Sequence, residues 1–162
     1  MSFSGNNRGY GNVRGNGPKN QNTDRTFSFS EKGFTDAKGN LREELMTTEA
    51  KEIAEYFKND RLTKSQLRAF YNEVKALKNK LSINKNEDKF AEIYPLILMM
   101  KSKVAYRASK DKRKMDGIKK FLDHGIDQIQ KENKVGKGRK AFENFATFFE
   151  VVVGYAYGSL ND

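Results

Sequence analysis

The sequence has no cysteine, no tryptophan, a single histidine and only two prolines among its 162 residues. Without cysteine, neither a disulfide framework nor a thiolate zinc site can stabilise the fold. His124 is the only imidazole, and its place beside Asp123 on a polar helix face is best interpreted as solvated. The carboxylates are scattered among lysines, which is typical of surface ion pairs and not of a tuned acid–base pair. We therefore expect no catalytic residues, no metal site and no cofactor, and we predict that the protein is not an enzyme.

Long hydrophobic runs are missing as well. The longest, "YPLILMM" from Tyr94 to Met100, is far too short to span a bilayer, and the first residues lack the apolar run of a signal peptide. The glycine-containing stretches "GYGNVRG" and "VGKGR" do not have the frame of a nucleotide-binding loop. These absences predict a cytoplasmic protein without a membrane partner.

The charge balance is strongly basic, because 31 lysines and arginines stand against 21 aspartates and glutamates, a formal net charge of +10. Such an excess favours an acidic partner, which a nucleic acid, an anionic membrane or an acidic protein surface would each provide. A chain of this length can bury one hydrophobic core. The net charge therefore predicts that the partner is negatively charged, and it leaves the class of partner open.

Glycine and asparagine dominate residues 1 to about 25. This segment has too few apolar side chains to offset the entropy of ordering, so we predict that it is disordered. We interpret "RGYGNVRG" as a solvated tether in preference to an RNA-binding segment of the RGG type. Phe27, Phe29 and Phe34 follow in a stretch that could dock on the domain or on a neighbour. We place a disordered or extended tail over residues 1–35 and a helical domain over residues 36–162.

Helical periodicity begins near Thr47, and five segments have the apolar spacing of amphipathic helices: residues 47–59, 63–81, 86–108, 112–132 and 137–157. Thr63 followed by Gln66 predicts a capping box at the start of the second. The third is apolar on nearly every side from Phe90 to Met100, so we expect it at the centre of a bundle. The aromatic stripe of the fifth is interpreted as core. The economical architecture is an all-α, five-helix bundle.

Cations cluster on two of these helices and on one loop. In the 63–81 segment, Lys64, Arg68, Lys75 and Lys78 fall within about 80° of one another, flanked by Tyr71. The other clusters are Lys103, Arg107 and Lys110 beside Tyr106, and Lys134, Lys137, Arg139 and Lys140 before the last helix. A column of like charges repels itself, and a phosphate backbone would relieve that repulsion through counterion release. Three basic elements that could converge thus predict a surface for a polyanion.

The stretches "LTKSQLRAFYNEVK", "LILMMKSKVAYRASK" and "FENFATFFEVVVGYAYG", in this order, resemble the small subunit of type III-A CRISPR interference complexes, the Csm type. The resemblance runs from about Leu45 to the C-terminus. It implies a five-helix bundle without catalytic activity, of which several copies stack head to tail as an inner filament beside the crRNA-binding backbone subunits. It also implies contacts to nucleic acid at Ser65, Gln66 and Arg68 and at the Lys101-to-Arg107 end of the next helix.

We therefore predict a non-catalytic RNA-binding scaffold of a type III-A CRISPR effector ribonucleoprotein in antiviral defence. Its expected partners are crRNA, target RNA, the backbone subunits, the large subunit and further copies of itself. The predicted RNA contacts are Lys64, Ser65, Gln66, Arg68, Lys75, Lys101, Lys103, Arg107 and Arg139. Arg68 and Arg107 lead this set because a guanidinium can hold a phosphate with two hydrogen bonds.

Two other classes stay open. The chain could be an oligomerising helical module that associates through Tyr71, Tyr106 and Tyr155, with its charge serving solubility or an acidic partner. Assembly that is insensitive to salt would mark that class. An independent binder of the helix-turn-helix kind would need a recognition helix, and no segment presents a compact set of Arg, Asn and Gln suited to base edges.

Overall fold

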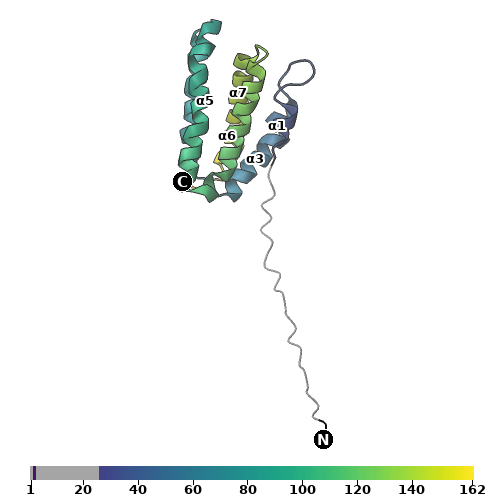
Figure 1. Ribbon diagram of the computed structural model, residues 1–162, viewed down its shortest axis with the longest axis vertical. Coiled ribbons are helices and arrows are strands. Elements are labelled where there is room, and N and C mark those ends of the chain that lie inside the picture. Colours follow the sequence, from purple (N-terminus) through teal and green to yellow (C-terminus); the bar gives the residue numbers. More distant parts are fainter. Residues whose placement is uncertain (1, 3–25) are drawn as a thin grey trace.

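The structure, a computed structural model, describes residue 2 and residues 26–162 (Figure 1). In this part of the chain the long helices are α3 (Thr48–Asn59), α4 (Lys64–Ile83), α5 (Glu87–Lys110), α6 (Lys112–Asn133) and α7 (Gly138–Tyr157). Each begins and ends within two residues of its predicted position. Two short helices, α1 (Ser28–Lys32) and α2 (Glu43–Met46), precede them. The predicted all-α, five-helix bundle is confirmed, while the tail predicted over residues 1 to about 25 lies outside the described residues except for residue 2.

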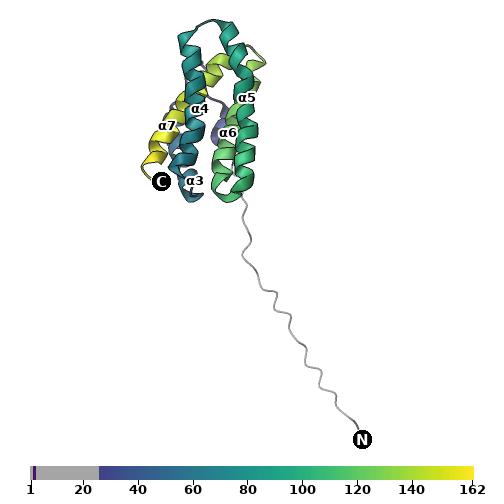
Figure 2. The same ribbon diagram turned by 90° about the vertical axis from the view of Figure 1, so that its left-hand side faces the viewer.

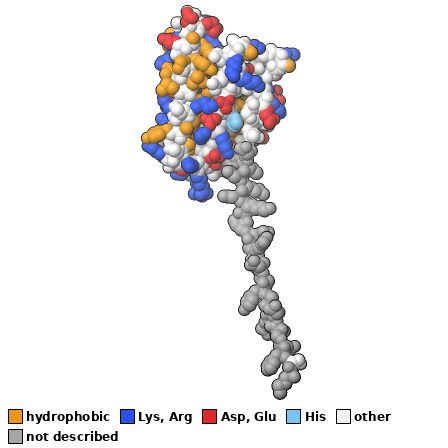
Figure 3. All heavy atoms as spheres, viewed as in Figure 1, with side chains coloured by type: hydrophobic (Ala, Val, Ile, Leu, Met, Phe, Trp, Pro, Cys, Tyr) orange, Lys and Arg blue, Asp and Glu red, His pale blue; other side chains and the backbone are white. Residues whose placement is uncertain are grey.

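The arrangement of the helices differs from the predicted one in its centre. α4 and α5 run antiparallel on one face of the bundle (Figure 2), α6 returns beside α5, and α7 packs against α3, α4 and α6. The expectation that the third long segment, α5, is central is wrong. It packs mainly on α6 and α4 and leaves Leu96 and Met99 40% and 49% exposed. α5 has more apolar side chains than α4 and α6 can bury. Figure 3 shows hydrophobic side chains gathered over this side of the molecule.

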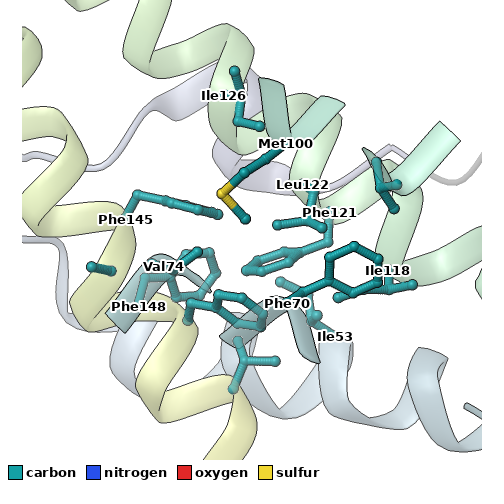
Figure 4. Packing of buried hydrophobic residues seen from close by; sticks show 14 of the residues in the cluster. Ile53, Phe70, Val74, Met100, Ile118, Phe121, Leu122, Ile126, Phe145 and Phe148 are labelled. Atoms are coloured by element: carbon teal, nitrogen blue, oxygen red, sulfur yellow. The ribbon is translucent and has the colours of Figure 1, made fainter. Parts of the chain in front are cut away.

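Aromatic rings fill the core, as the stripe of the last helix predicts. The ring of Phe121 on α6 lies 5.4 Å from that of Phe145 and 5.1 Å from that of Phe149, both on α7, and 5.9 Å from that of Phe57 on α3. All four side chains are buried, and Figure 4 shows Phe121 among labelled residues from several helices. Three helices therefore meet on one ring.

The segment before α2 belongs to the packed domain. Phe27, Phe29 and Phe34 are buried against this core, so the packed part of the chain begins at about residue 27 and not at 36. Arg42 holds the segment in place, because its guanidinium donates to the carbonyl of Gly33 at 2.9 Å and pairs with the carboxylate of Glu49 on α3 at 2.8 and 3.2 Å. Hydrophobic periodicity does not predict the packing of this segment on the bundle, because the segment is too short and irregular to show a helical repeat.

Candidate nucleic-acid interface

The first turn of α4 has the geometry that its sequence predicts. Thr63 Oγ1 accepts a hydrogen bond from the backbone N–H of Gln66 at 3.2 Å, and Gln66 Oε1 accepts one from the backbone N–H of Thr63 at 3.0 Å. This reciprocal pair is the capping box. It fixes where the helix begins and holds Gln66 in one orientation. Ser65, between the two, is exposed.

Tertiary packing brings this turn to the end of α5. Ser65, Gln66 and Arg107 line one groove of about 380 Å³. Ala69 and Phe70 of α4, Lys110 of α5 and Asp111 and Met115 at the start of α6 complete it. We call it the α4–α5 groove. Of the predicted contacts, these three therefore share one site, although Ser65 and Arg107 are more than forty residues apart in sequence.

Glu73 of α4 partly neutralises the cationic face. Its carboxylate pairs with Lys103 Nζ at 3.1 Å and with Arg107 Nη2 at 3.7 Å. Arg107 also lies over the ring of Phe70, 4.6 Å from its centroid. Such half-exposed ion pairs contribute little to stability, so the two cations can exchange Glu73 for another anion at small cost.

Lys64 and Arg68 meet the C-terminal segment. Lys64 Nζ and the Arg68 guanidinium lie 5.2 and 5.4 Å from the ring centroid of Tyr157 on α7. The Lys64 backbone N–H donates to the carbonyl of Asn161, and its ammonium pairs with Asp162 at 3.3 Å. Tyr157 thus becomes a neighbour of the site through packing alone. No spacing in the sequence links it to α4.

Lys75 lies further along α4, beside Tyr71, whose ring centroid is 5.9 Å from its ammonium. A smaller groove here, about 110 Å³, is lined by both residues together with Lys78 and Glu150. Burial, followed by the charge of Glu150 and a hydrogen bond to it, raises the pKa of Tyr71. Lys78 donates to Thr147 Oγ1 at 3.3 Å. The cations of this turn are therefore partly engaged with α7.

Lys101 and Arg139 are not brought to the groove. Lys101 pairs with Asp127 of α6 and does not line the groove. The guanidinium of Arg139 donates to the backbone carbonyls of Leu81, Asn84 and Asn86 at 3.0, 3.2 and 3.0 Å. Leu81 is about 20 Å along α4 from Arg68. The three basic elements of the sequence therefore do not converge, and only two of them meet.

Within the described part of the chain, no group of three or more His, Cys, Asp and Glu side chains is placed to hold a metal ion. None of the described helices combines the length and the hydropathy that a bilayer-spanning segment requires. The fold and the α4–α5 groove define a class, a small all-α bundle with cations beside a groove between two of its helices.

The chain belongs to the Csm2 family of type III-A systems, because the family model described as Csm2 Type III-A matches residues 40–158. The matched range covers every helix from α2 to α7. Membership makes the protein the small, structural subunit of a type III-A CRISPR effector, the Csm complex, and it indicates assembly with the other subunits of that complex. The predicted family is confirmed. Neither the curated proteins nor the solved structures that were compared gave a match.

Proposed function

We propose that this small subunit is a non-catalytic scaffold that binds the RNA of the cytoplasmic effector ribonucleoprotein and supports crRNA and its paired target in antiviral defence. Copies of the chain associate along an inner filament beside the crRNA-binding backbone subunits and the large subunit. Sequence recognition is left to base pairing between guide and target. The protein supplies the surface on which the paired strands lie.

One observation supports this proposal above the others: α4 and α5 both carry cations beside the groove that lies between them. Arg107 and Lys110 of α5 line it, and Lys103 lies one turn before Arg107. On α4, Arg68 is exposed one turn beyond Lys64. Phosphate groups would displace Glu73 from Lys103 and Arg107 and would release counterions. We therefore centre the RNA contacts on Ser65, Gln66, Arg68, Lys103 and Arg107, with Lys64 and Lys75 at the flanks. We assign Lys101 and Arg139 to holding helices and loops together.

A salt titration of RNA binding tests the proposal. For single-stranded RNA, each phosphate contact contributes about 0.7 to the slope of log affinity against log salt. The Arg68→Ala, Arg107→Ala variant should therefore lower the slope by about 1.4. Glu73→Gln should act in the opposite direction and tighten binding, because it removes the competing carboxylate.

The matched control removes two charges elsewhere. Lys58 on α3 and Lys131 on α6 are exposed, and the Lys58→Ala, Lys131→Ala variant should keep the wild-type slope. An equal loss in both double variants would refute a localised contact, since it would mean that net charge alone attracts RNA. Circular dichroism of each variant checks that the helices are intact, because loss of helix would identify Arg68 and Arg107 as structural residues.

A second function, a protein–protein module, is favoured by the exposed apolar side chains of α5. Leu96, Met99 and Tyr106 are 40%, 49% and 63% exposed, and Tyr155 of α7 is 42% exposed. Tyr71 is a poorer candidate because its ring packs edge-on against Phe149, at 5.7 Å between centroids. Self-association through α5 is compatible with RNA binding on the α4–α5 groove. Association that persists at high salt in Arg68→Ala, Arg107→Ala would separate the two surfaces.

A further inference from the structure

The α4–α5 groove has an apolar floor, which phosphate binding does not require. Ala69 and Phe70 of α4 and Met115 of α6 line it. Phe70 and Met115 are buried, so the half-buried Ala69 supplies the part of the floor that a ligand can contact. Its volume of about 380 Å³ is in the range of pockets that enclose small organic groups. A phosphate gains nothing from such a floor, because an ion prefers water to an apolar surface. The floor therefore suits a different part of the ligand.

The rim of the groove carries hydrogen-bond donors. Arg107 lines it with a half-exposed guanidinium whose Nη2 pairs with Glu73 at a distance of 3.7 Å. Because so long a half-exposed ion pair contributes little, an acceptor brought into the groove would take this donor at small cost. The Oε1 atom of Gln66 is already used by the capping box, so its amide NH₂ is the group that remains for a ligand. The ligand for this site is flat and apolar, with acceptor atoms on its edge.

We propose that the α4–α5 groove takes one unstacked nucleobase of the RNA whose phosphates lie along Arg68 and Lys103. This inference rests on the proposed function and names the part of the RNA that enters the protein. Single-stranded RNA is commonly held in this way, with bases turned out of the stack onto apolar or aromatic surfaces and hydrogen-bonded at their edges. Because neither donor selects among base edges, the site accepts different bases.

Charge favours a base over a protein side chain as the occupant. Arg107 and Lys110 stand at the groove with Asp111 as the acidic neighbour, and Asp111 accepts a hydrogen bond from the backbone N–H of Lys114 as the cap of α6. An apolar side chain from another subunit would fill the floor but bring no acceptor for the guanidinium of Arg107 or the amide NH₂ of Gln66. A nucleobase satisfies both, and its attached phosphates meet the flanking cations.

Filling the groove tests the inference without changing any charge. Ala69→Leu places a larger side chain on the floor, and Ala76→Leu makes the same change at an exposed position two turns further along α4. Both variants are measured in the effector complex reconstituted with the full-length chain, guide RNA and target RNA. The RNAs carry 2-aminopurine at one position per sample, because its fluorescence reports whether a base is stacked.

At one or more positions, 2-aminopurine should give an unstacked signal in the wild-type complex and in Ala76→Leu, and lose it in Ala69→Leu. RNA affinity should fall about fivefold to tenfold in Ala69→Leu, the low end of what one stacked base contributes, with an unchanged salt slope. An abasic nucleotide at the same position should weaken wild-type binding by a similar factor and leave Ala69→Leu unaffected. The abasic RNA tests the site even if Ala69→Leu loses helix.

Different failures have different meanings. If Arg68→Ala, Arg107→Ala weakens binding while neither Ala69→Leu nor the abasic nucleotide does, the nucleobase inference is overturned and RNA binding stands. If Ala69→Leu blocks assembly of the protein subunits before RNA is added, the groove is a protein interface and the inference is also overturned. If neither Arg68→Ala, Arg107→Ala nor the abasic nucleotide weakens RNA binding, both the nucleobase inference and the proposed function fail.

Discussion

Gly125 on α6 allows the packing of the core to be tested by a single methyl group. A Cβ atom at this position would lie 2.3 Å from Cε2 and 2.8 Å from Cδ2 of Phe145, far inside ordinary van der Waals contact. Phe145 has little room to withdraw, because its ring packs against those of Phe34, Phe121 and Phe149 at 6.0, 5.4 and 6.0 Å. In Gly125→Ala, α6 and α7 must move apart or the aromatic cluster must repack.

The magnitude follows from two opposing terms. Overpacking a close-packed core costs about 1–3 kcal/mol, and the depth of this overlap argues for the upper end. Alanine recovers about 1 kcal/mol because it favours the helix over glycine. We expect a net loss of about 2 kcal/mol in the free energy of unfolding, or a fall of about 4–8 °C in the melting temperature of a chain of this size.

Gly154 on α7 is the matched control, because a Cβ atom there would have no neighbour within 4 Å. Gly154→Ala should stabilise the protein by up to about 1 kcal/mol, the same helix-propensity gain without the overlap. Urea unfolding followed by circular dichroism measures both variants. Combining Gly125→Ala with Phe145→Leu should destabilise less than the sum of the single changes, since the smaller side chain removes the overlap. If Gly125→Ala instead stabilised the protein as Gly154→Ala does, the close approach of α6 and α7 would be refuted.

Two further predictions concern charged side chains. Arg139→Ala should lower the free energy of unfolding by about 2 kcal/mol, because three backbone carbonyls lose a charged donor. The control Lys140→Ala changes an exposed neighbour and should alter the free energy of unfolding by less than about 0.5 kcal/mol. Equal effects of the two variants in a urea titration would contradict the structural role of Arg139. Burial raises the pKa of Glu132 above its ordinary value of 4.5, against the opposing charges of Lys137 and Lys131. The folded chain therefore keeps this proton to higher pH than the unfolded chain, so the contribution of Glu132 to stability is present at low pH and is lost as pH rises through the raised pKa. Glu132→Gln should flatten this part of the pH profile and be more stable than the wild type at neutral pH, and an unchanged profile would show that Glu132 is solvated.

The helices were predictable because their signals are local. The apolar residues of α3 to α7 recur with the helical period, and the capping box of Thr63 and Gln66 involves residues three apart. The burial of Phe27 and Phe29 depends instead on contacts with residues far away in the sequence. Hydrophobic periodicity does not predict such contacts. The place of α5 at the edge of the bundle depends on how completely α4 and α6 cover it. Its apolar composition alone suggested a central helix.

The five long helices, the all-α class and the basic charge follow from residue type and local spacing. The family was indicated by the resemblance of three stretches of the sequence. Which cations share a surface depends on how the helices pack. The tertiary structure joined Ser65 and Gln66 to Arg107 around an apolar groove and placed Glu73 between Lys103 and Arg107. It also engaged Arg139 with backbone carbonyls at the far end of α4. The physical reason is that a side chain's partners across a helix interface depend on the rotation and offset of both helices, which the packing of the whole core sets.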